Sequence, residues 1–188
     1  MKTGSGTDFL RIDDLFKDFA TERTTFIGGS IDVAMGDQAG DSFELLVQTL
    51  DKSVHVGGSV NVRGADNVKV DGVGSSSDSD ETDVDIGSNL VVRSKLGATV
   101  EVDDTNVGGA TSIRLGNAGD FVRLQDSLFV RKLEVKLGGG DDTLRFETPV
   151  GCATDLSVDG GAGTDALELS ANAGVSGKTT IKKIEQTS

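Results

Sequence analysis

The segments LGGGDDTLRF (residues 137–146) and GGAGTDALEL (residues 160–169) carry one pattern twice. In each segment, closely spaced glycines precede an aspartate, Asp142 or Asp165, and two apolar residues then alternate with other residues. A period of two is typical of a β-strand with one buried face, and glycine permits the tight corner in front of it. The two segments therefore predict a corner followed by a strand, repeated in successive turns of the chain.

The same unit (small residue, aspartate, any residue, apolar, any residue, apolar) recurs along the chain. Its other copies are GTDFLRI (6–12), AGDSFEL (39–45), GADNVKV (64–70) and AGDFVRL (118–124). The last three aligned aspartates are evenly spaced, and the earlier intervals are longer. The interval from Asp66 to Asp120 holds two repeats if GATVEV (97–102) is a further unit, with Ala98 in the aspartate position. We interpret the remaining excess as insertions at one corner.

Two further elements precede each copy of this unit. The first has alternating apolar pairs, which are Ile31 and Val33, Val60 and Val62, Leu90 and Val92, Ile113 and Leu115, Leu133 and Val135, and Leu156 and Val158. The second is shorter, an apolar residue followed by small residues, and its copies start at Ile27, Val56, Ile86, Val107 and Val150. Each repeat thus contains three short strands, which is the arrangement of a parallel β-helix.

A single repeat has too little apolar surface to fold alone, but stacked repeats bury a continuous core. The sequence therefore predicts an all-β fold, a single right-handed parallel β-helix of about seven turns, with three short strands and about 22 residues in a regular turn. We expect one solenoid domain over residues 1–188, with insertions at about 13–23 and 72–83. The first insertion has apolar residues at the spacing of a short helix, and the second is an acidic, serine-rich loop.

Composition limits the classes of partner. The chain has 26 glycines, no Trp, no Tyr and a formal net charge of −13. Partners held by phosphate contacts require clustered Lys and Arg, so nucleic acid and anionic membranes are poor candidates. Cys152 is the only cysteine, which excludes an internal disulfide, and we interpret it as a small buried residue. The sequence also lacks the apolar run of a membrane-spanning helix, so we expect no membrane insertion.

The first residues, MKTGSGTDFL, lack the apolar core of a signal peptide. We interpret the chain as a piece of a longer exported protein, and expect it at the cell surface or outside the cell. Its expected partners are the extracellular matrix, a polysaccharide or neighbouring repeats of the parent protein. Because open solenoid ends expose strand edges, end-to-end association of copies is a further expectation.

The segment GGAGTDALE (160–168) resembles the calcium-binding nonapeptide of the haemolysin-type (RTX) proteins, and LGGGDDTLR (137–145) is a near copy. In that family, tandem nonapeptides form a parallel β-roll that holds Ca²⁺ between loops. The resemblance implies that Asp142 and Asp165 are carboxylate ligands. It also places four glycines in the binding loops, namely Gly138, Gly140, Gly161 and Gly163.

This sequence departs from that family because its copies do not follow each other directly. The residues on either side of the matching segments do not fit the nonapeptide. The wider repeat resembles instead the units of large bacterial secreted or surface-attached β-helix proteins, and this likeness spans most of the chain.

A repeat of this length stacks Asp120, Asp142 and Asp165 at one corner, about 5 Å apart. Carboxylates at that spacing repel each other, by roughly 1 kcal/mol in water, and a hard cation such as Ca²⁺ would relieve the repulsion. In the alternative interpretation, each aspartate accepts backbone N–H hydrogen bonds within its own turn. The sequence leaves both open, a calcium site and a structural turn.

Other polar groups give weaker indications. The acidic run DSDETD (78–83) lacks the glycine and glutamate positions of an EF-hand, so we interpret it as a solvated loop. His55 is the only histidine, and no Ser-His-Asp pattern accompanies it, which argues against catalysis by histidine. Two basic patches are interpreted as solvated strand faces. They comprise Arg131, Lys132 and Lys136, and Lys178, Lys182 and Lys183.

These observations favour a non-enzymatic structural or adhesive repeat module. The alternative is a β-helix that cleaves polysaccharides with acidic residues and calcium. The absence of Trp and Tyr, on which sugars usually stack, favours the first.

Overall fold

The computed structural model describes residues 1–2, 6–13, 23–36, 38–47, 52–72, 84–147, 150–170 and 173–187. Over these residues every regular element is a β-strand, and the strands form three parallel sheets of eight, seven and seven strands. The fold is a parallel β-helix, and the predicted fold class is confirmed.

Consecutive strands belong to different sheets, so that each sheet receives one strand per turn. Sheet A contains β3 (Ile31–Ala34), β6 (Val60–Arg63), β9 (Leu90–Arg93), β12 (Thr111–Arg114), β15 (Leu133–Gly139), β18 (Leu156–Ala162) and β21 (Thr179–Lys182). Sheet B contains β1 (Phe9–Asp13), β4 (Ser42–Leu46), β7 (Asn67–Asp71), β10 (Thr99–Asp103), β13 (Phe121–Leu124), β16 (Thr143–Phe146), β19 (Ala166–Leu169) and β22 (Gln186–Thr187). Sheet C contains β2 (Arg23–Ile27), β5 (Lys52–Val56), β8 (Val84–Ile86), β11 (Thr105–Val107), β14 (Ser127–Phe129), β17 (Val150–Cys152) and β20 (Ala173–Val175).

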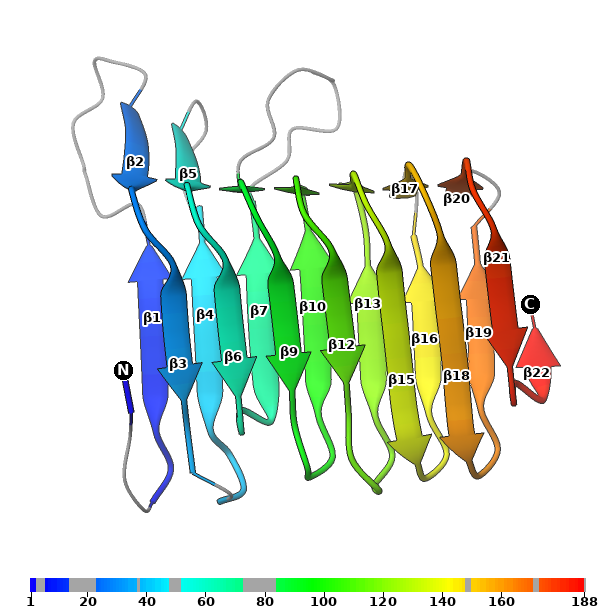
Figure 1. The fold of residues 1–188 in the computed structure, drawn as a ribbon. Helices are drawn as coiled ribbons and strands as arrows, with labels where there is room; N and C mark the ends of the chain where they lie inside the picture. Colours follow the sequence, from blue (N-terminus) through cyan, green and yellow to red (C-terminus); the bar gives the residue numbers. More distant parts are fainter. Residues whose placement is uncertain are drawn as a thin grey trace.

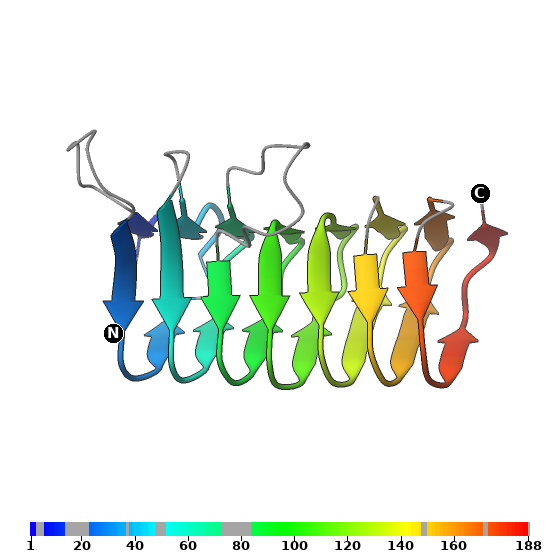
Figure 2. The ribbon, with the colours of Figure 1, turned by 90° about the horizontal axis from the view of Figure 1, so that it is seen from above.

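The coil is right-handed, as expected. In Figure 1 the strands of sheet B run upward behind the strands of sheet A, which run downward in front. Figure 2 shows the strands of sheet C crossing from the back to the front between them. Because successive turns advance from left to right, the chain turns in the right-handed sense along the axis.

Turn length follows from the register of sheet B. The aligned first residues are Phe9, Ser42, Asn67, Thr99, Phe121, Thr143, Ala166 and Gln186. From Thr99 onward these residues recur at nearly equal intervals, whereas the intervals before Thr99 are longer. This confirms a regular turn of about 22 residues. It also confirms GATVEV as a repeat in which Ala98 takes the aspartate position.

The longer turns carry their extra residues between a strand of sheet B and the next strand of sheet C. Of the predicted insertion at 13–23, Asp13 ends β1 and Arg23 begins β2. The intervening residues, on which the predicted helix falls, lie outside the described part of the chain. The same holds for residues 73–83 of the second insertion, which includes the acidic run DSDETD.

The core consists of apolar columns, one residue from each turn. In sheet B, the second strand residue contributes Val68, Val100, Val122, Leu144 and Leu167, and all five are fully buried. The parallel register stacks each side chain on its equivalent in the next turn, so the core continues without a break from turn to turn.

The structure corrects two alignments made from sequence. In sheet A, Ile113 pairs with Val92, so the predicted pair Ile113 and Leu115 is shifted by two residues. In sheet C, Val107 aligns with Phe129, which in turn aligns with Cys152. The predicted start at Val150 is therefore also shifted by two residues. Both errors arose because a core position holds a residue that the apolar pattern did not include, Thr111 in sheet A and Cys152 in sheet C. A shift of two residues keeps the alternation of inward and outward side chains, so the pattern alone does not reveal it.

Cys152 is buried, as predicted, and fills the core position that Phe129 occupies one turn earlier. This substitution of a large side chain by a small one accompanies a cavity of about 300 Å³ near the C-terminal turns. Its lining includes Phe146, Leu156 and Ile181, together with Cys152 itself. The cavity is open to solvent, since Leu169 and Ile181 in its lining are exposed.

Candidate functional site

Asp120, Asp142 and Asp165 stack at one corner, each immediately before a strand of sheet B. Their side chains are almost fully buried, at 3%, 1% and 0% exposure. Asp41 takes the same position in an earlier turn and is equally buried. The aspartates are therefore brought together as predicted, but they occupy the inside of the corner and not its solvent side.

Each of these carboxylates accepts a backbone N–H hydrogen bond from the turn before it. Asp142 Oδ1 accepts the N–H of Asp120 at 2.7 Å, and Asp165 Oδ1 accepts the N–H of Asp142 at 3.1 Å. Asp120 Oδ1 accepts the N–H of Ala98 at 2.5 Å. We call the series Asp120, Asp142 and Asp165 the aspartate ladder. The sequence-based alternative of a structural turn is supported, with the correction that the partner lies one turn earlier and not in the same turn.

Glu185 continues the aspartate ladder after the motif has ended. Its Oε2 accepts the N–H of Asp165 at 2.8 Å. Sequence reasoning missed this residue because it stands in a segment, TTIKKIEQTS, that lacks the glycine and aspartate of the corner. The available signal was its spacing of 20 residues from Asp165 and an acidic side chain at the aligned position. The longer glutamate replaces the aspartate without loss of the hydrogen bond.

Burial changes the protonation of the aspartate ladder. Removal from water disfavours the carboxylate and raises the pKa of Asp120 to about 7, with a further contribution from the charge of Asp142. The hydrogen bond from Ala98 acts in the opposite direction and lowers this pKa. Burial likewise raises the pKa of Asp142. Burial therefore disfavours the charged form of both groups, and Asp120 can gain or lose a proton near neutral pH.

The four glycines of the predicted site are required by close stacking of the corners. Gly138, Gly140, Gly161 and Gly163 all have positive φ, between 108° and 137°. A Cβ atom on Gly161 would overlap the carbonyl oxygen of Gly138 in the preceding turn, and one on Gly138 would overlap the oxygen of Gly116. These glycines are therefore explained by backbone geometry, whether or not a cation binds.

The aspartate ladder meets one requirement of a calcium site. Oδ2 of Asp120, Asp142 and Asp165 is buried and has no hydrogen-bond partner among the described protein atoms. Ca²⁺, however, takes 6–8 oxygen ligands, about 2.3–2.6 Å away. The ladder offers one free carboxylate oxygen per turn, so the remaining ligands would have to be backbone carbonyls of the glycine corner. Calcium binding at these residues stays a prediction.

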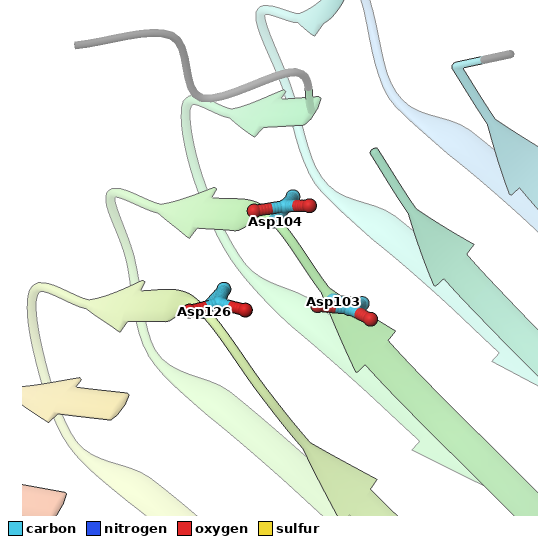
Figure 3. Close-up of side chains that lie close together, drawn as sticks. All are labelled: Asp103, Asp104 and Asp126. Carbon is cyan, nitrogen blue, oxygen red and sulfur yellow. The ribbon is translucent and has the colours of Figure 1, made fainter. Parts of the chain in front are cut away.

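A second group of carboxylates lies at another corner, between sheets B and C (Figure 3). Asp103 ends β10, Asp104 follows it, and Asp126 precedes β14 one turn later. One carboxylate oxygen from each lies within 4.8 Å of the others. We call this group the Asp103 cluster. Sequence reasoning missed it although VDDT (102–105) and LQDS (124–127) both place an aspartate before Thr or Ser. Asp103 has no acidic counterpart at Gln125, and the register brings the two corners together.

The electrostatics of the Asp103 cluster centre on Asp103. Burial raises its pKa to about 6, and the charges of Asp104 and Asp71 add to the effect. Arg123 acts in the opposite direction, with its guanidinium 3.7 Å from Asp103 Oδ2. The cluster therefore holds a carboxyl group that can gain or lose a proton near neutral pH.

His55 lies on the outer face of sheet C. Its Nδ1 is 2.7 Å from Asp85 Oδ2, and its ring stacks on Phe26 with centroids 5.0 Å apart. Asp85 stands in the next turn, at the position aligned with His55. The insertion between these turns conceals that register in the sequence. The pair fixes the orientation of the imidazole on an exposed surface.

Comparisons of this chain with protein families, with curated proteins and with solved structures found no match. In the described ranges, no helix is long and apolar enough to cross a membrane. The geometry of the sheets and of the carboxylate groups is therefore the basis for assigning a function.

Proposed function

We propose that this domain is a non-enzymatic structural or adhesive repeat module of a larger exported bacterial protein. One observation carries the proposal: three parallel sheets continue in register through all the turns, from β1 to β22. The continuous core ties each turn to the next, and the hydrogen bonds of the aspartate ladder add links between the later turns. Such a solenoid acts as a spacer, or presents long flat faces to a partner.

The expected partners are the extracellular matrix, a polysaccharide or neighbouring repeats. The exposed edges of the terminal strands also offer unpaired N–H and C=O groups to a second copy, which would add its own strands end to end. Analytical ultracentrifugation over a range of concentrations measures this association.

The alternative function is that of a polysaccharide-cleaving β-helix, and the Asp103 cluster favours it. A carboxyl group with a pKa of about 6, beside two other carboxylates, has the properties of a general acid or base. The decisive experiment is a screen of acidic polysaccharides for ultraviolet-absorbing lyase products and for new reducing ends. We expect neither product. Turnover by the unmodified domain that is lost in an Asp103→Asn variant would show that the domain is an enzyme, and would contradict the proposed non-enzymatic module.

Calcium is an additional stabiliser in this proposal. The free Oδ2 atoms of Asp142 and Asp165 support it, as does the resemblance of their segments to RTX repeats. Burial raises the pKa of Asp142 and so disfavours the carboxylate form that a cation would bind. The function as a module does not depend on calcium.

A further inference from the structure

The charged residues on the outward faces of sheets A and B are arranged differently. Along sheet B, the outward position that starts with Arg11 continues as Glu44, Lys69, Glu101, Arg123, Arg145 and Glu168. Charges in this row alternate over most of its length, and its cations have carboxylate partners. Opposite charges on neighbouring strands stabilise a sheet, so this row is explained by the fold itself.

Along sheet A, four cations stand in the same outward position of four consecutive turns. The register pairs Arg63 with Arg93, Arg93 with Arg114, and Arg114 with Lys136. All four side chains are exposed. We call these residues the basic row. Its strands β6, β9, β12 and β15 lie side by side on the front face of the solenoid in Figure 1.

The basic row has few carboxylates to balance it. Glu134 is shared, because Arg114 binds it at 2.8 Å and Lys136 approaches it at 3.7 Å. Arg63 and Arg93 have no ion pair among the described residues. Like charges placed directly opposite each other destabilise a strand pair. The fold therefore gives no reason for this arrangement, in a chain whose net charge is −13.

We propose that the basic row binds an acidic polysaccharide, whose carboxylate groups each meet one cation as the sugar chain runs along the solenoid axis. The inference rests on the proposed function as an adhesive module and names its ligand class. Arginine suits this role, since its guanidinium can bind a carboxylate through two parallel hydrogen bonds.

The spacing of the basic row suits a long, linear ligand. Neighbouring strands are about 4.8 Å apart, so the row presents one cation at that interval along the solenoid axis. A linear polyanion that lies along this axis can therefore meet several of these cations at once. Of such ligands, an acidic polysaccharide agrees with the expected partners of an exported adhesive module.

The neighbouring outward position carries little negative charge beside the basic row. Asn61, Val91 and Ser112 stand beside Arg63, Arg93 and Arg114 on the same strands. Of the four neighbours of the row, only Glu134, beside Lys136, is acidic. The rest of this acidic molecule repels a polyanion, so binding is confined to the face that carries the row.

The test compares two double variants that lose the same charge from different faces. Arg63→Gln with Arg93→Gln removes the two cations that lack ion pairs with described residues. Arg123→Gln with Arg145→Gln removes two cations of sheet B. The probe is polygalacturonate, with neutral dextran and single-stranded DNA alongside, measured by isothermal titration calorimetry at low and at physiological salt. Circular dichroism melting verifies that each variant is folded.

We expect polygalacturonate to bind, more weakly as salt increases, and dextran not to bind. The Arg63 and Arg93 variant should weaken binding about tenfold or more, and the Arg123 and Arg145 variant less than about twofold. Equal weakening in both variants would show a general effect of net charge and would contradict the assignment of the binding site to the basic row. So would the absence of polygalacturonate binding at low salt, or tighter binding of DNA through the same row.

The outcome for the site and the outcome for the proposed function are distinguishable. Cleavage of bound polygalacturonate would contradict the non-enzymatic module while leaving the basic row as its binding site. Absence of both binding and cleavage would overturn the inference on the basic row alone.

Discussion

At the scale of single residues, the corner glycines and the buried aspartates carry the stacking of turns. The glycines let one backbone approach another more closely than a Cβ atom permits, and the aspartates bond the N–H groups that this approach brings near. Both residue types were identified from the sequence as a motif. The two roles depend on each other, because the aspartate carboxylate of one turn accepts a hydrogen bond from the backbone of the neighbouring turn.

We expect Gly161→Ala to destabilise the domain by about 2 kcal/mol or more, because φ is 108° and the new Cβ would overlap the Gly138 carbonyl oxygen. Gly174→Ala is the matched control, since a Cβ there meets no atom within 4 Å. Urea denaturation measures both free energies of unfolding. Equal effects would show that close stacking at Gly161 is not required.

The raised pKa of Asp120 predicts that stability falls as pH rises. The folded state binds this proton more tightly than the unfolded state, whose pKa is 3.8. The contribution is therefore present in full below 3.8 and is lost as pH rises to about 7, by at most about 4 kcal/mol. Thermal melts between pH 4 and pH 8, in buffer with a chelator, measure this slope.

In the Asp120→Asn variant the slope should flatten, because the amide oxygen still accepts the N–H of Ala98 but carries no charge. A smaller slope should remain, since the pKa of Asp142 is raised in the same direction. An unchanged slope would place the pH dependence in other groups.

At the scale of elements, the strands of sheet B were the most predictable. Most of them follow an aspartate corner and have two apolar residues at alternate positions, so a local pattern fixes both the start and the buried face of the strand. Strands of sheet C are only three residues long in the later turns, and Phe129 was not recognised as a core residue. A short strand with one strong apolar position contains too little periodicity to fix its alignment.

Leu144 in β16 tests the core column of sheet B. It stacks between Val122 and Leu167 and is fully buried. Leu144→Ala should cost about 2–5 kcal/mol, since the fixed spacing of the strands limits collapse around the cavity. Thr143→Ala, on the outward side of the same strand, should cost much less. Denaturant titration compares the two, and similar values would contradict the assigned faces.

At the scale of the whole molecule, the stacking of turns creates rows of like residues that no single repeat reveals. The aspartate ladder, the alternating charges of sheet B and the basic row of sheet A all arise in this way. Each is a line of side chains parallel to the solenoid axis, so each is suited to a ligand or partner that is itself extended.

The prediction of calcium binding concerns these rows, and it is tested on the whole domain. A cation that binds only the folded state raises its stability by RT ln(1 + [L]/Kd). We expect millimolar calcium to raise the melting temperature, and Asp142→Asn with Asp165→Asn to abolish that rise while retaining the hydrogen-bond acceptors. If the melting temperature still rises in the Asp142→Asn, Asp165→Asn double variant but not in an Asp126→Asn variant, the ion binds at the Asp103 cluster. No rise, with no heat in calorimetry, would contradict calcium binding.

The sequence by itself determined the parallel β-helix, the length of its regular turn and the inward columns of sheet B. These depend on local alternation and on spacing between like corners, which can be read along the chain. The tertiary structure decided that the aspartates point inward and bond the preceding turn. It also decided that Asp103, Asp104 and Asp126 meet, that His55 pairs with Asp85, and that four cations align on sheet A. The physical reason is register: the partners lie one turn apart in the chain, insertions separate some of them, and only the stacked strands determine which residues become neighbours.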